Sequence, residues 1–139
     1  MRYPFQCPNN VFDGIFCEHT LEHFSIDDVS KILKEIYRIL KPKGTLRLSV
    51  PHLALCVERY LQEKQIETKK ALASEHIRKL TQEYLHLSVW DYERLEYELT
   101  RAGFEHIECA EYGKGRDTLL IFDLKQRAHE SLYVEASKK

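Results

Sequence analysis

The stretch 11–50 constrains the fold of this chain most, because short turns join a strand pattern, a long helix pattern and a second strand pattern. Residues 11–17 (VFDGIFC) are apolar on both faces, which is typical of a strand that is covered on both sides. Residues 26–40 place apolar side chains at helical spacing in a single stripe. Residues 45–50 (TLRLSV) give the second strand pattern. A strand–helix–strand unit predicts an α/β fold.

Both ends of the helix in this unit have sequence signals. Ser25 followed by Asp28 is a capping-box pattern, in which the serine side chain accepts a hydrogen bond from the first turn. Pro42 and Gly44 follow the last apolar residue of the stripe, and both residue types end helices. The helix is therefore expected to begin at Ser25 and to end just before Pro42.

The middle of the chain is mainly helical. Residues 53–61 fit a second amphipathic helix, and residues 62–90 form a charged, variable helical excursion. Ser88 with Asp91 repeats the capping-box pattern and predicts the start of another helix. Gly103 is expected to end that helix.

Two later stretches complete the predicted sheet. Residues 104–112 and 131–136 (SLYVEA) fit strands, whereas 118–122 (TLLIF) fits either a short strand or a buried loop. We therefore expect a single α/β domain over residues 1–139, with a mostly parallel sheet of about four strands flanked by helices. The strand at 11–17 is apolar on both faces, which is unusual at a sheet edge, so another strand should pair with it.

Composition and charge argue against several classes of function. The 139 residues include 21 Lys and Arg against 22 Asp and Glu, and this balance gives no basic excess for binding nucleic acid. No apolar run reaches the ~20 residues of a membrane span, and the first ten residues lack the apolar core of a signal peptide. The four cysteines are scattered, which favours reduced thiols and a cytoplasmic location. Cys17 and Cys109 lie in strand patterns and are expected to be buried.

The order of several short motifs resembles that of small class I S-adenosylmethionine-dependent methyltransferases of the type 11-like family. In that family an FD-x-I strand leads into an H-x-L-E-H turn, and the following helix ends in R-x-L-K-P-x-G before a strand with a terminal proline. The resemblance covers nearly the whole chain, including AGF at 102–104 and the closing strand. The matching residues in the first part are Tyr3, Pro4, Phe5, Phe12, Asp13, Ile15, His19, Leu21, Glu22, His23, Arg38, Leu40, Lys41, Pro42, Gly44 and Pro51.

Two features depart from the family pattern. The family's N-terminal half has a strand with a Gly-rich turn and an acidic residue that holds the cofactor ribose, and neither precedes the strand at 11–17. The resemblance therefore implies a partial Rossmann-like fold that lacks the N-terminal cofactor-binding half. Gly113 and Gly115 precede TLLIF rather than a helix and do not form a nucleotide-binding turn. Lys43 replaces the family's usual glycine in a surface turn, where we expect little effect.

The resemblance also implies where S-adenosylmethionine would bind, at the point where the strand order of the complete sheet reverses. The end of the first strand, with Cys17, Glu18 and His19, would form one wall of the cofactor crevice. Methyl transfer mainly requires that donor and acceptor be held at attack distance, and His19 is the candidate general base where the acceptor must lose a proton. His52 and Trp90 are candidate contacts of the acceptor, although both also fit purely structural roles.

Residues 19–23 also spell H-x-x-E-H, the inverted zinc-protease pattern. A zinc site of that kind needs both histidines on one helical face and a third ligand further along the chain. Here the motif bridges the end of a strand and a helix capped at Ser25, so a continuous helix is not expected. The sequence therefore predicts no metal site.

Two functional hypotheses remain open. In the first, the chain is part of a methyltransferase that acts on a small molecule or a sugar, and the excursion 62–90 helps to select the acceptor. In the second, it is a non-catalytic, methyltransferase-like relic that acts as a dimerisation or interaction module. The sequence leaves open whether this chain alone binds cofactor. Under both hypotheses we expect a homodimer joined along Val11–Cys17, or a partner that supplies the missing half, and no nucleic acid or membrane as partner.

Overall fold

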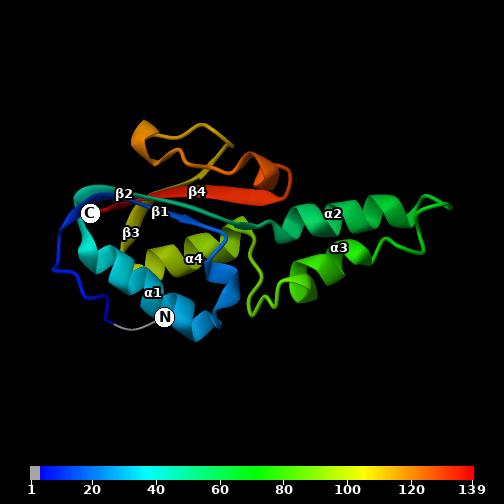
Figure 1. Cartoon of the computed structure of the whole chain (residues 1–139), viewed down its shortest axis with the longest axis horizontal. Coiled ribbons are helices and arrows are strands. Elements are labelled where there is room, and N and C mark those ends of the chain that lie inside the picture. Colours follow the sequence, from blue (N-terminus) through cyan, green and yellow to red (C-terminus); the bar gives the residue numbers. More distant parts are fainter. Residues whose placement is uncertain (1–3) are drawn as a thin grey trace.

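A computed structural model describes residues 4–139, so Tyr3 of the family resemblance lies outside the described range (Figure 1). Strands and helices alternate through the first half, as expected, and two strands close the sheet. In chain order the elements are β1 (Phe12–Glu18), α1 (Ile26–Ile39), β2 (Leu40–Pro51), α2 (Leu53–Lys64), α3 (Glu75–Arg78), α4 (Tyr92–Ala102), β3 (Phe104–Ala110) and β4 (Ser131–Lys138).

The four strands form one sheet in the order β1-β2-β4-β3. β1 and β2 are parallel, whereas β4 is antiparallel to both of its neighbours. The expected number of strands is confirmed, and β1, β2 and β3 point the same way, but β4 makes the sheet mixed rather than mostly parallel. The reason is the connection 111–130, which lacks the crossover helix that parallel neighbours need. β1 lies at an edge of this sheet, with β2 as its one strand partner among residues 4–139.

Helix α1 begins at the capping signal in the sequence. The side chain of Ser25 accepts a hydrogen bond of 3.3 Å from the backbone N–H of Asp28, which confirms the predicted N-cap. The helix ends at Ile39, where the chain extends into β2. Lys43 has a φ of 64°, in the left-handed region that favours glycine. Contrary to the sequence-based expectation, the family's glycine is therefore replaced at a position where a side chain is strained.

Helix α4 begins three residues later than the capping pattern predicts. Asp91 is the N-cap, and its carboxylate accepts a hydrogen bond of 2.9 Å from a backbone N–H in the first turn. Ser88 is buried instead: its hydroxyl donates to the carbonyl oxygen of Leu21 and accepts from the indole N–H of Trp90 at 3.0 Å. Both the serine and the aspartate of the pattern S-x-x-D can cap a helix. Here Asp91 is the cap, because the hydroxyl of Ser88 is used in contacts with Leu21 and Trp90.

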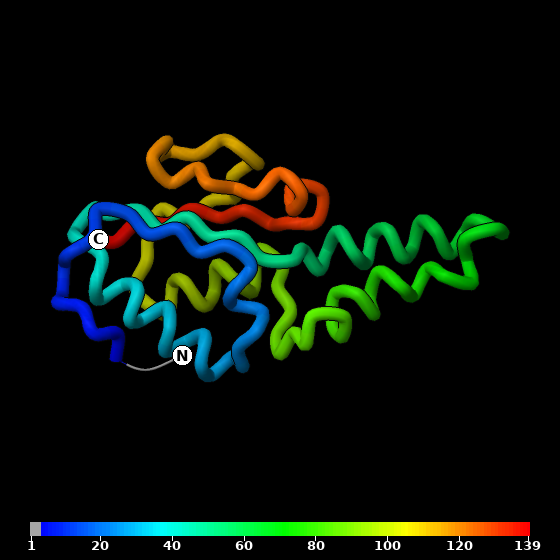
Figure 2. Tube along the Cα trace, in the orientation of Figure 1, coloured from blue at the N-terminus to red at the C-terminus, as the bar shows by residue number. Residues whose placement is uncertain are grey.

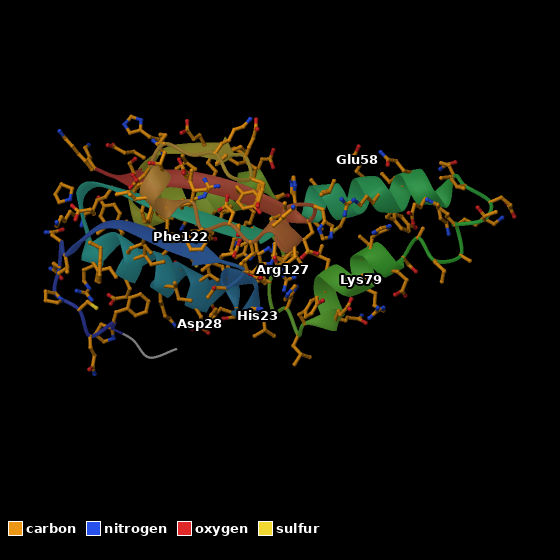
Figure 3. All side chains as sticks on the ribbon, turned by 45° about the horizontal axis from the view of Figure 1, so that its top comes forward. His23, Asp28, Glu58, Lys79, Phe122 and Arg127 are labelled. Carbon is orange, nitrogen blue, oxygen red and sulfur yellow. The ribbon has the colours of Figure 1, made fainter. Side chains whose placement is uncertain are left out.

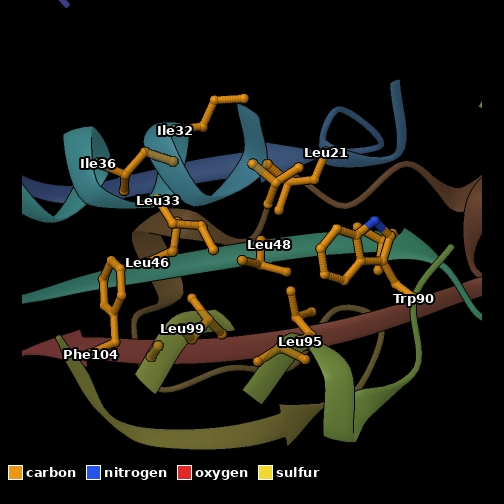
Figure 4. Packing of buried hydrophobic residues seen from close by; sticks show 14 of the residues in the cluster. Leu21, Ile32, Leu33, Ile36, Leu46, Leu48, Trp90, Leu95, Leu99 and Phe104 are labelled. Carbon is orange, nitrogen blue, oxygen red and sulfur yellow. The ribbon is translucent and has the colours of Figure 1, made fainter. Parts of the chain in front are cut away.

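Helices α1 and α4 cover one face of the sheet and enclose the hydrophobic core (Figure 4). Trp90 lies at one end of this cluster and Phe104 at the other, with leucines of α1, α4 and β2 between them. Fully burying such a side chain contributes roughly 1.5–3 kcal/mol each, so this layer supplies most of the hydrophobic stabilisation. The labelled core residues are Leu21, Ile32, Leu33, Ile36, Leu46, Leu48, Trp90, Leu95, Leu99 and Phe104.

The opposite face of the sheet is covered by residues 111–130, called here the cover segment, which lies above β2 and β4 in Figure 2. Its stretch TLLIF forms a short 3-10 turn at Thr118–Leu120 rather than a strand. The ring of Phe122 packs 5.8 Å from that of Phe16 on β1. The side chains of Arg47 and Asp123 are both fully buried and form an ion pair that fastens the cover segment to β2.

Helices α2 and α3 form a helical hairpin that projects away from the sheet (Figure 1). The hairpin begins directly after β2 with α2, and its remainder, which returns to the core at Trp90, occupies the predicted excursion 62–90. No helix among residues 4–139 is long and apolar enough to cross a membrane.

The two cysteines expected to be buried lie in different surroundings. Cys17 packs against the core, as expected. Cys109 is exposed, which contradicts the expectation: it lies opposite the core residue Val134, but β3 is the edge strand of the sheet and leaves this position open to solvent. All four cysteines are free thiols.

Candidate functional site

The predicted site residue His19 follows directly after the last residue of β1. Its backbone N–H donates a hydrogen bond of 2.9 Å to the carbonyl oxygen of Ser49 on β2. Its φ is 42°, and a positive φ at a residue other than glycine is uncommon and clusters at functional sites. The ring is only 11% exposed and lies between Ser131 and Glu22.

The directions of the hydrogen bonds define the state of the His19 ring. The Ser131 hydroxyl donates its hydrogen to the carbonyl oxygen of Arg127 at 2.8 Å. The same oxygen, 2.6 Å from His19 Nε2, therefore accepts from an Nε2–H. The other ring nitrogen, Nδ1, lies 3.3 Å from Oε1 of Glu22. Both nitrogens of His19 thus face groups of this chain, and an acceptor proton reaches the ring only by way of Ser131 or by displacing it.

Cys17 and Glu18, the other two predicted cofactor contacts, are engaged within the fold. Burial raises the pKa of the Cys17 thiol to about 11, so the side chain is a protonated core group. The carboxylate of Glu18 accepts a hydrogen bond of 3.0 Å from the backbone N–H of Leu124. It therefore holds the cover segment at the end of β1.

His52 and Trp90, the predicted acceptor contacts, lie side by side in an isolated β-bridge. The backbone N–H of His52 donates to the carbonyl oxygen of Glu130 at 2.9 Å. Burial lowers the pKa of His52, against the opposing effect of the Asp91 and Glu93 carboxylates. Trp90 is fully buried in the core. The structure therefore gives the Trp90 indole a packing role and no surface for an acceptor.

A cavity of about 600 Å³ opens between the helical hairpin and the end of the cover segment, just beyond the carboxyl end of β2. Figure 3 labels one residue from each wall, Lys79 from the hairpin and Arg127 from the cover segment. None of the predicted site residues, Cys17, Glu18, His19, His52 and Trp90, lines it. The lining residues are Pro51, Cys56, Arg59, His76, Lys79, Leu80, Glu83, Tyr84, His86, Leu124, Gln126, Arg127, His129 and Glu130.

The cavity wall contains one pair of opposite charges, Arg127 with Glu130. Arg127 donates to Glu130 at 2.7 Å, and this hydrogen bond raises the pKa of Arg127. The guanidinium of Arg59 donates to the carbonyl oxygen of His129 at 2.7 Å. The predicted site residues adjoin the wall through their partners, because His19 contacts Ser131, next to Glu130, and Glu18 holds Leu124.

Sequence reasoning missed Ser131, Arg127 and His86. Ser131 starts the predicted last strand, and nothing in its local pattern indicates a contact with a histidine 112 residues away. His86 lies within the predicted excursion 62–90, where no local motif distinguishes it. One signal could have located Ser131. It begins the last strand, and because that strand is antiparallel to β2, its first residue lies opposite Pro51, at the carboxyl end of β2.

Comparisons with known proteins bear on the fold of the chain. Residues 3–48 match the family described as Methyltransferase domain, which is 46 of the 139 residues. No curated protein sequence matches the chain.

Solved structures resemble nearly the whole chain. A possible exported protein from Bordetella parapertussis is 17% identical with a TM-score of 0.62, over 96% of this chain and 41% of that one. A SAM-dependent methyltransferase from Thermotoga maritima, a possible histamine N-methyltransferase, is 17% identical with a TM-score of 0.56, over 97% and 60%. A Haloferax volcanii methyltransferase solved with the activator Trm112 is 14% identical with a TM-score of 0.57, over 96% and 56%.

The fold resembles part of the fold of solved S-adenosylmethionine-dependent methyltransferases. More narrowly, the first third of the chain carries the sequence pattern of the Methyltransferase domain family, so the resemblance inferred from the motifs is confirmed. The chain spans about two-fifths to three-fifths of the length of these solved chains.

Proposed function

We propose that this chain forms the acceptor-side part of an S-adenosylmethionine-dependent methyltransferase that acts on a small molecule or a sugar. The observation that carries the proposal is the cavity of about 600 Å³ at the carboxyl end of β2, next to the strand end that carries His19. Ligand sites of α/β folds lie beyond the carboxyl ends of the strands, and cavities of roughly 300–1,000 Å³ suit small molecules. Residues 62–90 supply one wall, which supports a role in acceptor selection.

Within this proposal the chain's own residues position the acceptor and take its proton. Methyl transfer needs donor and acceptor to be held in line, which a walled cavity favours. His19 serves as general base once the Ser131 hydroxyl turns its hydrogen from the carbonyl oxygen of Arg127 to an unprotonated Nε2. Nδ1–H then faces Glu22, 3.3 Å away, which stabilises the imidazolium that forms. Glu18 and the main chain of Cys17 stand at the cofactor side.

The cofactor half of the site has to be completed by other residues than those described. The free edge of β1 is the surface where we expect a completing strand to pair, from a partner or from a second copy of the chain. The Haloferax volcanii structure supports a partner, because that methyltransferase was solved with an activator. The free cysteines support a reducing, cytoplasmic compartment.

Calorimetric titration of the full chain with S-adenosylmethionine and with its demethylated product tests the proposal. Micromolar binding that Glu18→Ala weakens, and that the exposed-site control Glu105→Ala leaves unchanged, supports a surviving or shared cofactor site. No binding at millimolar cofactor, to the chain alone or with a copurified partner, supports the alternative, a non-catalytic interaction module. Sedimentation of the same samples measures whether a homodimer is present.

A further inference from the structure

The carboxylate of Glu22 is buried without a hydrogen bond. The residue is 1% exposed, and no group of residues 4–139 donates a hydrogen bond to either of its side-chain oxygens. Ring nitrogens of His19 and His23 lie near its oxygens, at 3.3 Å and 3.9 Å, and the Arg127 guanidinium acts on it only at longer range. A buried carboxylate without partners is strongly disfavoured, and native proteins satisfy such groups with a hydrogen bond, an opposite charge or a metal ion.

A third histidine completes the surroundings of this carboxylate. Backbone N–H groups of Leu87 and Ser88 both donate to the carbonyl oxygen of Glu22, at 2.7 and 3.1 Å. These bonds fix the preceding residue, His86, beside His23, where the two rings meet edge to face with centroids 4.9 Å apart. The backbone therefore sets the position of His86 beside His23, so this position does not depend on a chance contact between two surface side chains.

The His86 ring is oriented as metal-binding histidines usually are. Its Nδ1 lies 2.6 Å from the carbonyl oxygen of Leu80, which can only accept, so Nδ1 carries the proton. The lone pair then lies on Nε2. Metal-ligating histidines almost always donate their other ring N–H to a carbonyl or carboxylate, which fixes the ring and raises its basicity.

We infer that Glu22, His23 and His86 bind a divalent transition-metal ion of the zinc type. One ligand atom from each of the three lies within 4.8 Å of the others. Tetrahedral zinc, with bonds of about 2.0–2.2 Å, holds its ligand atoms about 3.4 Å apart. A side-chain rotation of His23, which is 43% exposed, closes this gap. Two imidazoles and one carboxylate are the ligand set of many open zinc sites.

The sequence alone predicted no metal site, because H-x-x-E-H at residues 19–23 was not expected to form one continuous helix. Residues 21–23 form a short 3-10 turn, and His19 precedes it with a positive φ, so H-x-x-E-H is not one continuous helix. The third ligand comes instead from His86, which also lines the cavity. The open coordination position of the ion therefore adjoins the cavity wall.

The test is calorimetric titration of the metal-freed full chain with zinc chloride. We expect one Zn²⁺ per chain with a Kd tighter than about 10 μM, a standard binding free energy near −7 kcal/mol. His23→Gln and His86→Gln should each weaken binding at least tenfold, the loss seen when even an outer partner of a ligand is removed. The matched control is His76→Gln, because His76 lines the same cavity but pairs with Glu63 at 3.0 Å.

Two results would overturn the assignment. One is a wild-type Kd weaker than about 100 μM, as for scattered surface histidines. The other is equal weakening by the control and by His23→Gln. Because His86 also holds Leu80, His23→Gln on the surface is the decisive variant should His86→Gln fail to fold. Cobalt(II) adds a spectroscopic readout: its visible absorption should appear with the wild type and be lost in His23→Gln. None of these measurements depends on methyl transfer.

Discussion

Arg47 and Asp123, 76 residues apart in the sequence, form a two-point ion pair in which neither side chain is exposed. Glu135 on β4 accepts from the same guanidinium at 2.9 Å. Burial alone would lower the pKa of Arg47, but the hydrogen bonds with Asp123 and Glu135 outweigh it and raise the pKa. The charge at this position therefore joins β2, β4 and the cover segment.

Arg47→Met should lower the free energy of unfolding by about 3–5 kcal/mol, because it leaves the buried carboxylate of Asp123 without its cation and leaves Glu135 with Arg116 alone, at 3.5 Å. Urea unfolding followed by circular dichroism measures the loss. Lys114→Met is the control, since the pair of Lys114 with Glu111 is exposed and its loss should change the free energy of unfolding far less. Equal losses in the two variants would contradict the structural role given to Arg47.

Ser88→Ala should cost about 1–3 kcal/mol, because the indole N–H of Trp90 loses its buried acceptor. The chain has one tryptophan, so its fluorescence reports on this site specifically. Asp91→Ala should cost about 1 kcal/mol through the lost N-cap and leave the emission maximum in place. A shifted emission in Asp91→Ala with none in Ser88→Ala would reverse the assignment of the two residues.

Lys43→Gly should stabilise the protein by up to about 1 kcal/mol, because a left-handed backbone costs roughly 1–2 kcal/mol for a residue with a side chain. The flexibility of glycine in the unfolded chain offsets part of this gain. Lys34→Gly, inside helix α1, is the opposite control and should destabilise by about 1 kcal/mol. Thermal unfolding of the three proteins compares them, and a loss in Lys43→Gly would count against the strained turn.

Cys17 should resist alkylation until the pH approaches 11. Burial raises the pKa of its thiol from 9.0 to about 11, and the thiolate is the reactive form. The native state thus holds a proton that the unfolded chain has lost, so this group's contribution to stability is complete below pH 9 and falls as the pH rises through 11. Mass spectrometry after iodoacetamide treatment should find exposed Cys109 modified first, and early modification of Cys17 would refute its burial.

His52 should titrate below its usual pKa of 6.5, because burial disfavours the imidazolium. The Asp91 and Glu93 carboxylates oppose this shift, so Asp91→Asn, which keeps a capping side chain, should lower the pKa further. Titration of the ring by NMR measures both proteins. A rise in the pKa of His52 in the variant would show that Asp91 does not act on it.

The sequence predicted the parts of the fold that local patterns determine. Ser25 caps α1 and Gly103 follows the last residue of α4, because a capping side chain and a glycine act on their own helix. The sequence also placed His19 near the end of a strand, because the apolar run of that strand ends at Cys17. The contacts that define the site join distant segments: Ser131 with His19, and His86 with the turn of Glu22. Only the completed topology brings such groups together, and the direction of β4 was not determined by its own pattern.

The position of β4 has a consequence for folding during synthesis. Residues 131–138 form an inner strand, between β2 and β3, although they follow every other element in the chain. Until they leave the ribosome, β2 and β3 have no common neighbour and β2 exposes a row of unpaired backbone groups. Pairings between segments so far apart form slowly, because the intervening chain must first be brought together. Until β4 has been synthesised, the sheet of the nascent protein is therefore incomplete at its centre, and its unpaired strands are prone to association.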